Sequence, residues 1–345
     1  MKLTFEQICS VTIGAVDVKQ EADGIHFFRF NQEQRTYDKV TYRQTQVVAF
    51  KKKLLATAGI KLSFRTDSRT LKVCADMSFA TGRTYYALDV VVDGVLLGGV
   101  DNYAQTELCR NYAEQSFGAG GDTVELELGE GEKEVCIHLP WGAGTVLKEL
   151  ELEDGASLTP VIPSKKLLVF GDSITQGYDA LRPSNRYIAR LAQALDAQEY
   201  NKAIGGAVTF PELARSREDF EPDYVVVAYG ANDWRFITPE DFHARYSATL
   251  DIICENYPST QMFLLTPIWR KDLDTESPWE RFELVEQYIR DIAAAHAPNA
   301  AVIRGFDLVP HDEAYYADLR LHPNDAGFDC YFEHLWPQIK AVLKE

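Results

Sequence analysis

The sequence predicts an α/β protein in which an N-terminal all-β sandwich, jelly-roll-like in its strand spacing, precedes a three-layer α/β/α domain with a parallel sheet. The chain has 345 residues, which is long for one domain and comfortable for two. Short β-branched and aromatic runs alternate with turn residues up to residue 160, and similar runs alternate with helical patterns beyond it. Residues 158–164 contain two prolines and suit an extended linker. We therefore expect a β-sandwich domain over residues 1–160 and an α/β domain over residues 161–345.

The predicted sandwich rests on short apolar runs that are separated by turn signals. Asp93-Gly94 and the segment Gly129-Glu130-Gly131 each separate two such runs, as in β-hairpins. Several short strands at this spacing are typical of a two-sheet all-β domain. The expected strands span residues 25–30, 46–50, 61–65, 71–79, 85–92, 95–100, 123–128, 134–139 and 146–152.

The predicted α/β domain follows from alternating strands and helices. Thr238-Pro239-Glu240 supplies a capping residue and a proline at the first position of one helix, and Ser184 is the expected N-cap of another. Crossovers between parallel strands are right-handed, so helices cover both faces of the sheet and functional residues gather beyond the carboxyl ends of its strands. The expected strands span residues 166–170, 224–228, 262–265 and 301–303, and the expected helices span residues 184–195, 278–295 and 327–343 as well as the segment from Thr238.

The chain is strongly acidic. It carries 35 Lys and Arg against 52 Asp and Glu, a formal net charge of −17. Phosphate backbones and anionic lipid surfaces repel such a protein unless it presents a local basic patch. The densest cationic run, Lys51-Lys52-Lys53, is expected only to solvate the end of a strand. We therefore expect neither nucleic acid nor a membrane as a partner.

The N-terminus and the cysteines bear on the compartment. Glu6 and Gln7 interrupt the stretch in which a secretory signal needs a continuous apolar core. No apolar run approaches the ~18 residues that a membrane-spanning helix needs. The six cysteines include no Cys-x-x-Cys pair and lie far apart, which favours reduced thiols over a disulfide framework. These observations predict a cytoplasmic protein, and the sequence indicates no oligomeric state.

Three polar residues are expected at the functional edge of the parallel sheet. Ser173 follows the strand at residues 166–170, Asn232 follows the strand at residues 224–228, and His322 precedes the last helix. A histidine can accept the proton of a serine hydroxyl, and an asparagine amide can donate a hydrogen bond to a developing oxyanion. This set of residues predicts acyl transfer.

Four sequence blocks resemble those of the GDSL, or SGNH, hydrolase family. Residues 171–177 read Gly-Asp-Ser-Ile-Thr-Gln-Gly, residues 201–206 read Asn-Lys-Ala-Ile-Gly-Gly, residues 230–233 read Gly-Ala-Asn-Asp, and residues 322–324 read His-Pro-Asn. Any one of these strings is a weak signal, but four in the family's order, each where a loop is expected, are specific. The resemblance covers residues 165–345 and implies a flavodoxin-like three-layer fold.

The resemblance also implies roles for individual residues. Ser173 would be the nucleophile, and His322 would be the general base and then the general acid. The backbone N–H groups of Ser173 and Gly206 and the side-chain amide of Asn232 would form the oxyanion hole. The seven histidines include no metal-binding pattern such as His-Glu-x-x-His, so no metal and no other cofactor is expected.

One position departs from the family's pattern. The family typically places an aspartate three residues before the histidine, whereas here Leu319 occupies that position and Asp318 lies four residues before His322. In a helical turn Asp318 would still reach the imidazole and complete a triad. In an extended segment it would point away, and a backbone carbonyl would orient the ring of a Ser–His dyad. We expect the triad with Asp318, and the dyad stays open.

Two tryptophans and an arginine are candidate substrate-binding residues. Trp234 follows Asn232 by two positions, and Trp269-Arg270 follows the strand at residues 262–265. Exposed indoles beside an acyl-transfer site suit stacking on a sugar ring, and Arg270 suits a carboxylate or the pocket rim. The alternative is that both tryptophans are packing residues.

The expected function is hydrolysis of short-chain O-acyl esters, above all O-acetyl esters, of a small-molecule or oligosaccharide substrate through an acyl-Ser173 intermediate. An N-terminal β-sandwich joined to such a hydrolase is similar to two-domain carbohydrate esterases, although residues 1–160 contain no motif that supports this likeness. One alternative is a lysophospholipase or thioesterase with a longer acyl preference. The other is a carbohydrate-binding protein whose hydrolase domain has decayed.

Overall fold

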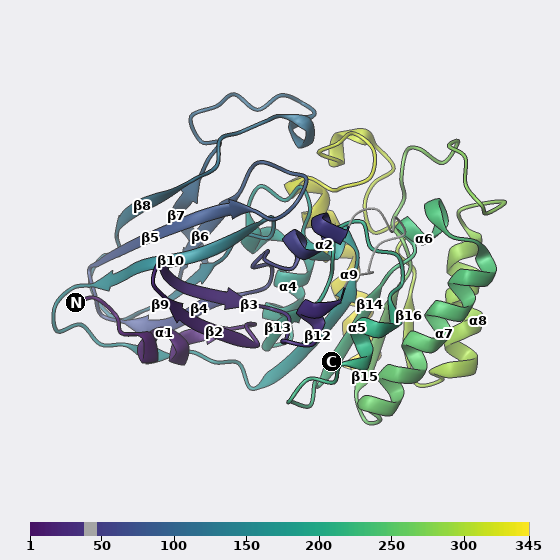
Figure 1. The fold of residues 1–345 in the computed structure, drawn as a ribbon, viewed down its shortest axis with the longest axis horizontal. Coiled ribbons are helices and arrows are strands. Elements are labelled where there is room, and N and C mark those ends of the chain that lie inside the picture. Colours follow the sequence, from purple (N-terminus) through teal and green to yellow (C-terminus); the bar gives the residue numbers. More distant parts are fainter. Residues whose placement is uncertain (38–46, 345) are drawn as a thin grey trace.

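The N-terminal region folds into two antiparallel sheets (Figure 1), in a computed structural model that describes residues 1–37 and 47–344. The first sheet has the order β1-β4-β9-β6-β7 with β11 paired to β4, and the second has the order β2-β3-β10-β5-β8. The strands of the first sheet are β1 (Thr12–Ile13), β4 (Lys61–Thr66), β6 (Ala87–Val92), β7 (Val95–Asp101), β9 (Lys133–His138) and β11 (Thr159–Pro160). Those of the second are β2 (Asp17–Glu21), β3 (Gly24–Phe28), β5 (Thr70–Phe79), β8 (Gly120–Glu127) and β10 (Ala143–Leu152).

Side chains from the facing sides of these two sheets form one core. Strand β9 alternates buried and half-buried residues, as the period of two in a β-strand requires. Leu62 and Ile137 of the first sheet belong to the same buried cluster as Val73 and Leu147 of the second. This packing confirms the predicted all-β N-terminal region.

One expected strand, at residues 46–50, is wrong. Residues 47–50 lie in helix α2 (Val47–Lys53), and residue 46 lies outside the described residues. The β-branched residues of this run favour a strand, but tertiary context overrides the propensity of so short a segment. The three lysines occupy the last turn of α2, where positive charge complements the helix dipole, so they do not solvate a strand end.

The C-terminal region contains a five-stranded parallel sheet with the order β13-β12-β14-β15-β16. Counted from β12 along the chain this order is 2-1-3-4-5, the flavodoxin-like arrangement, which confirms the predicted fold class. The strands are β12 (Lys165–Gly171), β13 (Ala197–Asn201), β14 (Tyr224–Ala228), β15 (Gln261–Leu265) and β16 (Ala301–Ile303). Besides α2, the described residues form the α-helices α1 (Phe5–Val11), α3 (Ser173–Gln176), α4 (Tyr187–Ala194), α5 (Pro211–Arg215), α6 (Ala231–Phe236), α7 (Pro239–Asn256), α8 (Leu284–His296) and α9 (Asp325–Leu343).

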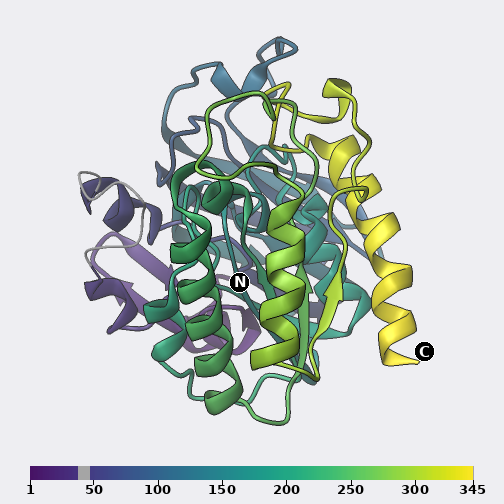
Figure 2. The same ribbon diagram turned by 90° about the vertical axis from the view of Figure 1, so that its right-hand side faces the viewer.

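Helices cover both faces of the parallel sheet. Buried side chains of α4 and α9 share one apolar cluster, and those of α5, α7 and α8 share another. Figure 2 shows α7 and α8 next to each other, with α9 apart from them. Helix α7 begins where the sequence predicts, with Thr238 as the N-cap and Pro239 at the first helical position. Among the described residues, no helix combines the length and the hydropathy of a bilayer-spanning segment.

The expected N-cap at Ser184 is wrong. Ser184 lies in a 3₁₀ turn, Pro183–Asn185, and α4 begins only at Tyr187. The Ser184 hydroxyl and N–H both donate to the carboxylate of Asp89 on β6, at 2.6 and 3.0 Å. The Ser184 side chain therefore makes a tertiary contact with the N-terminal region and does not cap a helix.

The two regions share a continuous apolar core. Tyr85 and Trp141 of the N-terminal region belong to the same buried cluster as Tyr178 and Tyr187 of the C-terminal region. The rings of Trp141 and Tyr178 lie 4.9 Å apart, and the Trp141 indole N–H donates to the carbonyl of Ala180 at 2.7 Å. The predicted division at residues 160 and 161 stays a prediction, and the buried contacts run across it.

Candidate active site

Ser173 lies where the parallel sheet ends in a short helix. Strand β12 stops at Gly171, and Ser173 begins α3 with Asp172 as its N-cap, whose carboxylate accepts the N–H of Ile174 at 3.0 Å. Burial raises the pKa of Asp172 to about 7. Gly177 ends this helix at φ +112°, and a Cβ there would lie 1.9 Å from the side chain of Arg186. The glycine is thus required both by the backbone and by the close approach.

Ser173, His322 and Asp318 form a continuous hydrogen-bonded chain. Ser173 Oγ lies 2.8 Å from His322 Nε2, and His322 Nδ1 lies 2.7 Å from Asp318 Oδ2. All three side chains are largely buried, with 12% of the His322 side chain exposed. The distances are those of a nucleophile, a general base and an orienting carboxylate.

The aspartate reaches the imidazole because its loop is neither a helix nor extended. Leu319 adopts a left-handed conformation at φ +56°, which folds the segment back on itself. Asp318 Oδ1 accepts the N–H groups of Arg320, Leu321 and His322, at 3.0, 2.7 and 3.0 Å. Burial opposes ionisation of Asp318, but the facing imidazole and these N–H donors outweigh it and hold the pKa of the carboxyl well below its usual range. The geometry supports the triad rather than the dyad.

The oxyanion-hole candidates line the same space as Ser173. Gly206 follows β13 at φ +79°, and Asn232 lies in the first turn of α6. The N–H of Gly205 donates to Gln176 Oε1 at 2.8 Å, whereas the Gly206 N–H makes no hydrogen bond to any of the described residues. The Asn232 amide donates to the carbonyl of Ala207 at 3.0 Å and keeps its second N–H for another acceptor. These contacts favour Gly206 over Gly205 as an oxyanion donor.

A lysine of the N-terminal region holds the peptide that carries this N–H. Lys53 Nζ donates to the carbonyl oxygen of Gly205 at 2.5 Å, so it contacts the peptide unit between Gly205 and Gly206. Burial lowers the pKa of Lys53. Sequence reasoning missed this residue, and the lysine run at residues 51–53 is the only signal that could have drawn attention to it.

An arginine of the N-terminal region lies behind the imidazole and was also missed. Arg83 Nε and Nη2 bind the two carboxylate oxygens of the fully buried Asp179, at 2.6 and 2.7 Å. Arg83 Nη2 and Asp179 Oδ2 lie 3.5 and 3.6 Å from His322 Nδ1. Although burial opposes its charge, the contact with Asp179 raises the pKa of Arg83. No sequence motif marks either residue, because their pairing depends on how the two regions pack.

The same side chains are the candidate metal ligands of this edge. Ligand atoms of Asp179, Asp318 and His322 lie within 4.8 Å of one another. Arg83 already neutralises Asp179 and would repel a cation at this point. The arrangement therefore suits an imidazole that is held by two carboxylates better than it suits a metal ion.

The three predicted substrate-binding residues are placed differently from one another. Trp234 is 2% exposed and packs edge-on against Phe282, because two positions along helix α6 turn it away from Asn232. Trp269 is half-buried, stacks on His311 at 5.4 Å and does not line the pocket. Arg270 lines the pocket, but Asp272 binds it through both carboxylate oxygens at 2.5 and 2.8 Å. The expectation of two exposed indoles is wrong for this pocket, and the packing alternative fits both.

A pocket of about 600 Å³ opens over Ser173 and His322. Residues from both regions line it: Lys52, Lys53, Ala80, Thr81, Gly82, Arg83, Ser173, Tyr178, Gly205, Gly206, Asn232, Arg235, Phe236, Arg270, Asp272, Arg320, Leu321 and His322. The pocket therefore has room for a group of sugar size next to the serine.

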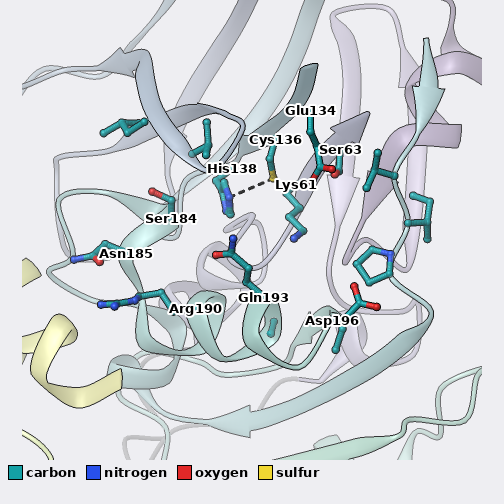
Figure 3. Close-up of a pocket in the computed structure, with 18 of the residues that line it drawn as sticks. Lys61, Ser63, Glu134, Cys136, His138, Ser184, Asn185, Arg190, Gln193 and Asp196 are labelled. Atoms are coloured by element: carbon teal, nitrogen blue, oxygen red, sulfur yellow. Dashed lines mark hydrogen bonds between the residues drawn. The ribbon is translucent and has the colours of Figure 1, made fainter. Parts of the chain in front are cut away.

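A second cavity of about 530 Å³ lies between strands β4 and β9 and helix α4 (Figure 3). Cys136 Sγ and His138 Nε2 lie 3.3 Å apart in its wall. Burial raises the pKa of the Cys136 thiol and lowers that of the His138 imidazole well below its usual range. A neutral thiol beside a weakly basic imidazole is a poor nucleophile, so this pair is a weaker candidate for acyl transfer than Ser173 and His322.

The sheet order and the serine–histidine–aspartate geometry at its carboxyl edge define a three-layer α/β/α serine hydrolase. Residues 169–330 match the family model described as GDSL-like lipase/acylhydrolase. Residues 169–330 therefore form a GDSL-like lipase/acylhydrolase domain, and this domain supports a serine ester hydrolase. A comparison with curated protein sequences gave no significant match.

Solved structures resemble the whole chain, including the β region. A salicylyl-acyltransferase of a tetracycline biosynthetic pathway superposes with a TM-score of 0.75 at 22% identity over 96% of this chain and 94% of its own. A protein from Bacteroides ovatus described as a GDSL-like lipase gives 0.75 at 20% identity over 100% and 98%. A family two carbohydrate esterase from Clostridium thermocellum, in complex with cellohexaose, gives 0.61 at 17% identity over 84% and 94%. At these identities the likeness concerns the fold.

Proposed function

We propose that the chain hydrolyses short-chain O-acyl esters, above all O-acetyl esters, of a carbohydrate through an acyl-Ser173 intermediate. The hydrogen-bonded chain from Ser173 through His322 to Asp318 is the observation that supports this most. The assembled chain and the family match also argue against a decayed hydrolase domain.

The proposed reaction proceeds in two halves. His322 Nε2 accepts the hydroxyl proton as Ser173 Oγ attacks the ester carbonyl carbon, and the oxyanion receives hydrogen bonds from the N–H groups of Ser173 and Gly206 and from the Asn232 amide. The imidazolium, stabilised by Asp318, then protonates the leaving alkoxide, and the acyl group stays on Ser173. In the second half His322 takes a proton from water, the hydroxide attacks the acyl carbon, and the carboxylic acid leaves as Oγ is reprotonated.

The pocket lining favours a small acyl group. Apart from Ala80, Phe236 and Leu321, its side chains are polar or charged, or belong to glycine and tyrosine, among the residues that the structure describes. A long acyl chain needs a continuous apolar groove, so this lining argues against the lysophospholipase and long-chain thioesterase alternative. The carbohydrate esterase among the structural neighbours supports a sugar as the alcohol half.

Transfer of the acyl group to an alcohol other than water is a second candidate function. The salicylyl-acyltransferase shares the fold over nearly the whole of both chains. The same acyl-Ser173 intermediate would serve both reactions, and only the acceptor would differ. Adding glycerol or a free sugar during turnover separates the two, because transfer yields a new ester at the expense of free acid.

Hydrolysis of p-nitrophenyl esters from acetate to octanoate tests the proposal. We expect acetate to be preferred and Ser173→Ala to lower kcat by about 1,000-fold or more. Ser10→Ala removes a hydroxyl from the exposed face of α1 and is the matched control, which should keep full activity. Preference for octanoate, or full activity of Ser173→Ala, would contradict the proposal.

A further inference from the structure

The active-site pocket has the opposite charge to the rest of the chain. The protein carries a formal net charge of −17, yet six basic residues and a single acidic one line this pocket in the part of the chain that the structure describes. The acidic residue is Asp272, and the basic residues are Lys52, Lys53, Arg83, Arg235, Arg270 and Arg320. A cationic pocket in an acidic protein concentrates anions at that point.

Four of these cations have a polar partner within the protein. Arg83 binds Asp179, and Arg270 binds Asp272, in each case through both carboxylate oxygens. Arg320 lies 3.7 Å from Asp272. Lys53, as described above, donates to a backbone carbonyl.

Lys52 and Arg235 have no such partner in the part of the chain that the structure describes. Within residues 1–37 and 47–344, neither side chain has a hydrogen bond or an ion pair, and Arg235 contacts only the ring of Phe236, at 6.0 Å. Each lies in the last turn of a helix, Lys52 in α2 and Arg235 in α6, where a positive charge is favourable. The last turn of α2 carries three lysines and that of α6 carries one arginine. The helix dipole does not explain why two cations from different regions, each without a charged partner among the described residues, face one pocket.

We propose that Lys52 and Arg235 bind an anionic group on the alcohol half of the ester, so that the substrate is an O-acylated sugar acid. This inference rests on the proposed function. The acyl group occupies the space at Ser173 and the oxyanion donors, and neither cation contacts the Ser173–His322–Asp318 chain. A guanidinium matches the two oxygens of a carboxylate or a phosphate, and the pocket of about 600 Å³ accommodates a sugar ring.

The test compares an acetylated methyl glucuronoside with the corresponding acetylated glucuronamide, which has the same shape and no charge. Acetate release gives kcat/KM for both. We expect the charged ester to be preferred by about tenfold or more at low salt, and the preference to shrink in about 0.5 M salt as screening grows. An acetylated sugar phosphate in a third arm identifies the anion: a stronger preference for it would overturn the assignment to a sugar acid.

Variants locate the effect. Arg235→Gln and Lys52→Gln should each reduce the ratio of kcat/KM between the charged and the neutral ester, and Arg235→Lys should keep part of it. Lys340→Gln, which removes a cation from α9, is the control and should leave the ratio unchanged. Equal kcat/KM for the two esters would overturn the inference while the proposed function stands. If neither these esters nor p-nitrophenyl acetate were hydrolysed, the proposed function would fall and this inference with it.

Discussion

The two regions of the molecule contribute to the active-site pocket in different ways. The C-terminal region places Ser173, Asn232 and His322 at the carboxyl edge of a parallel sheet, each within a recognisable sequence block. The N-terminal region contributes Lys53 and Arg83, which contact the neighbours of Gly206 and His322 and belong to no motif. Catalytic residues need a fixed residue type and a fixed spacing in the sequence. Supporting charges need only a suitable position in the folded structure, which different sequences can provide. Variants of residues in either region test this difference.

Asp318→Asn should have the largest effect among variants of residues other than Ser173. The amide can present its N–H to the imidazole and hold the wrong tautomer, so we expect kcat to fall by about 100- to 10,000-fold. Steady-state kinetics on p-nitrophenyl acetate measure it. Asp312→Asn, which alters an exposed aspartate six positions before Asp318, is the control. A loss below about tenfold would mean that another group orients His322 and would revive the dyad.

Arg83→Met should have an intermediate effect and a distinct pH signature. Without the guanidinium, the Asp179 carboxylate faces His322 Nδ1 at 3.6 Å uncompensated and favours the imidazolium. We expect kcat/KM to fall by about 10- to 100-fold and its acidic limb to move to higher pH.

The double variant Arg83→Met/Asp179→Asn keeps this prediction testable, because it avoids leaving a buried carboxylate unpaired. Its acidic limb should return to the wild-type position. An unmoved limb in a folded Arg83→Met protein would show that the arginine has a structural role alone.

Lys53→Met should have a smaller effect on catalysis. The carbonyl of Gly205 would lose its donor, and the peptide that presents the Gly206 N–H would be less firmly oriented. We expect kcat to fall by about tenfold with little change in KM, since the oxyanion exists only along the reaction path. Lys53→Arg retains a donor and should restore part of the rate. A raised KM at constant kcat would instead indicate a ground-state contact with substrate.

Asp325→Asn should have the smallest effect, which is on the stability of the folded chain. Burial raises the pKa of Asp325 to about 6, so the folded protein holds a proton that the unfolded chain has already lost above about pH 4. Its stabilising contribution is therefore present at low pH and disappears as pH rises toward 6. Because the Asn side chain does not titrate, we expect the Tm of the variant to rise relative to that of the wild type by about 2–4 °C between pH 4 and pH 7 in calorimetry. A constant difference would contradict the raised pKa.

The sequence predicts best what local signals determine. Strands β14 and β16 have the expected bounds, because short buried apolar runs mark them, and α7 begins at its Thr-Pro signal. The site blocks meet because parallel strands end at one edge. By contrast, the helix at residues 47–53, the unused cap at Ser184 and the buried Trp234 depend on tertiary contacts, which a single sequence does not display.

The site itself divides in the same way. The blocks around Ser173 and His322 are visible in the sequence, and their roles stay proposals supported by the distances. Asp318 was ambiguous because only the left-handed Leu319 decides which way its loop bends. Asp179 and its partner Arg83 are 96 positions apart, and no local pattern connects them.

The continuous core has a consequence for the modularity of this protein. Trp141 and Tyr85 belong to the same buried cluster as Tyr178 and Tyr187, the Trp141 ring packs on that of Tyr178, and the Trp141 indole is hydrogen-bonded to the C-terminal backbone. A hydrolase half cut free at residue 161 would expose this aromatic surface to water and lose Lys53 and Arg83 together. Recombination among relatives would therefore have to transfer both halves together, and we expect the β region to be inherited as part of the enzyme rather than as an exchangeable domain.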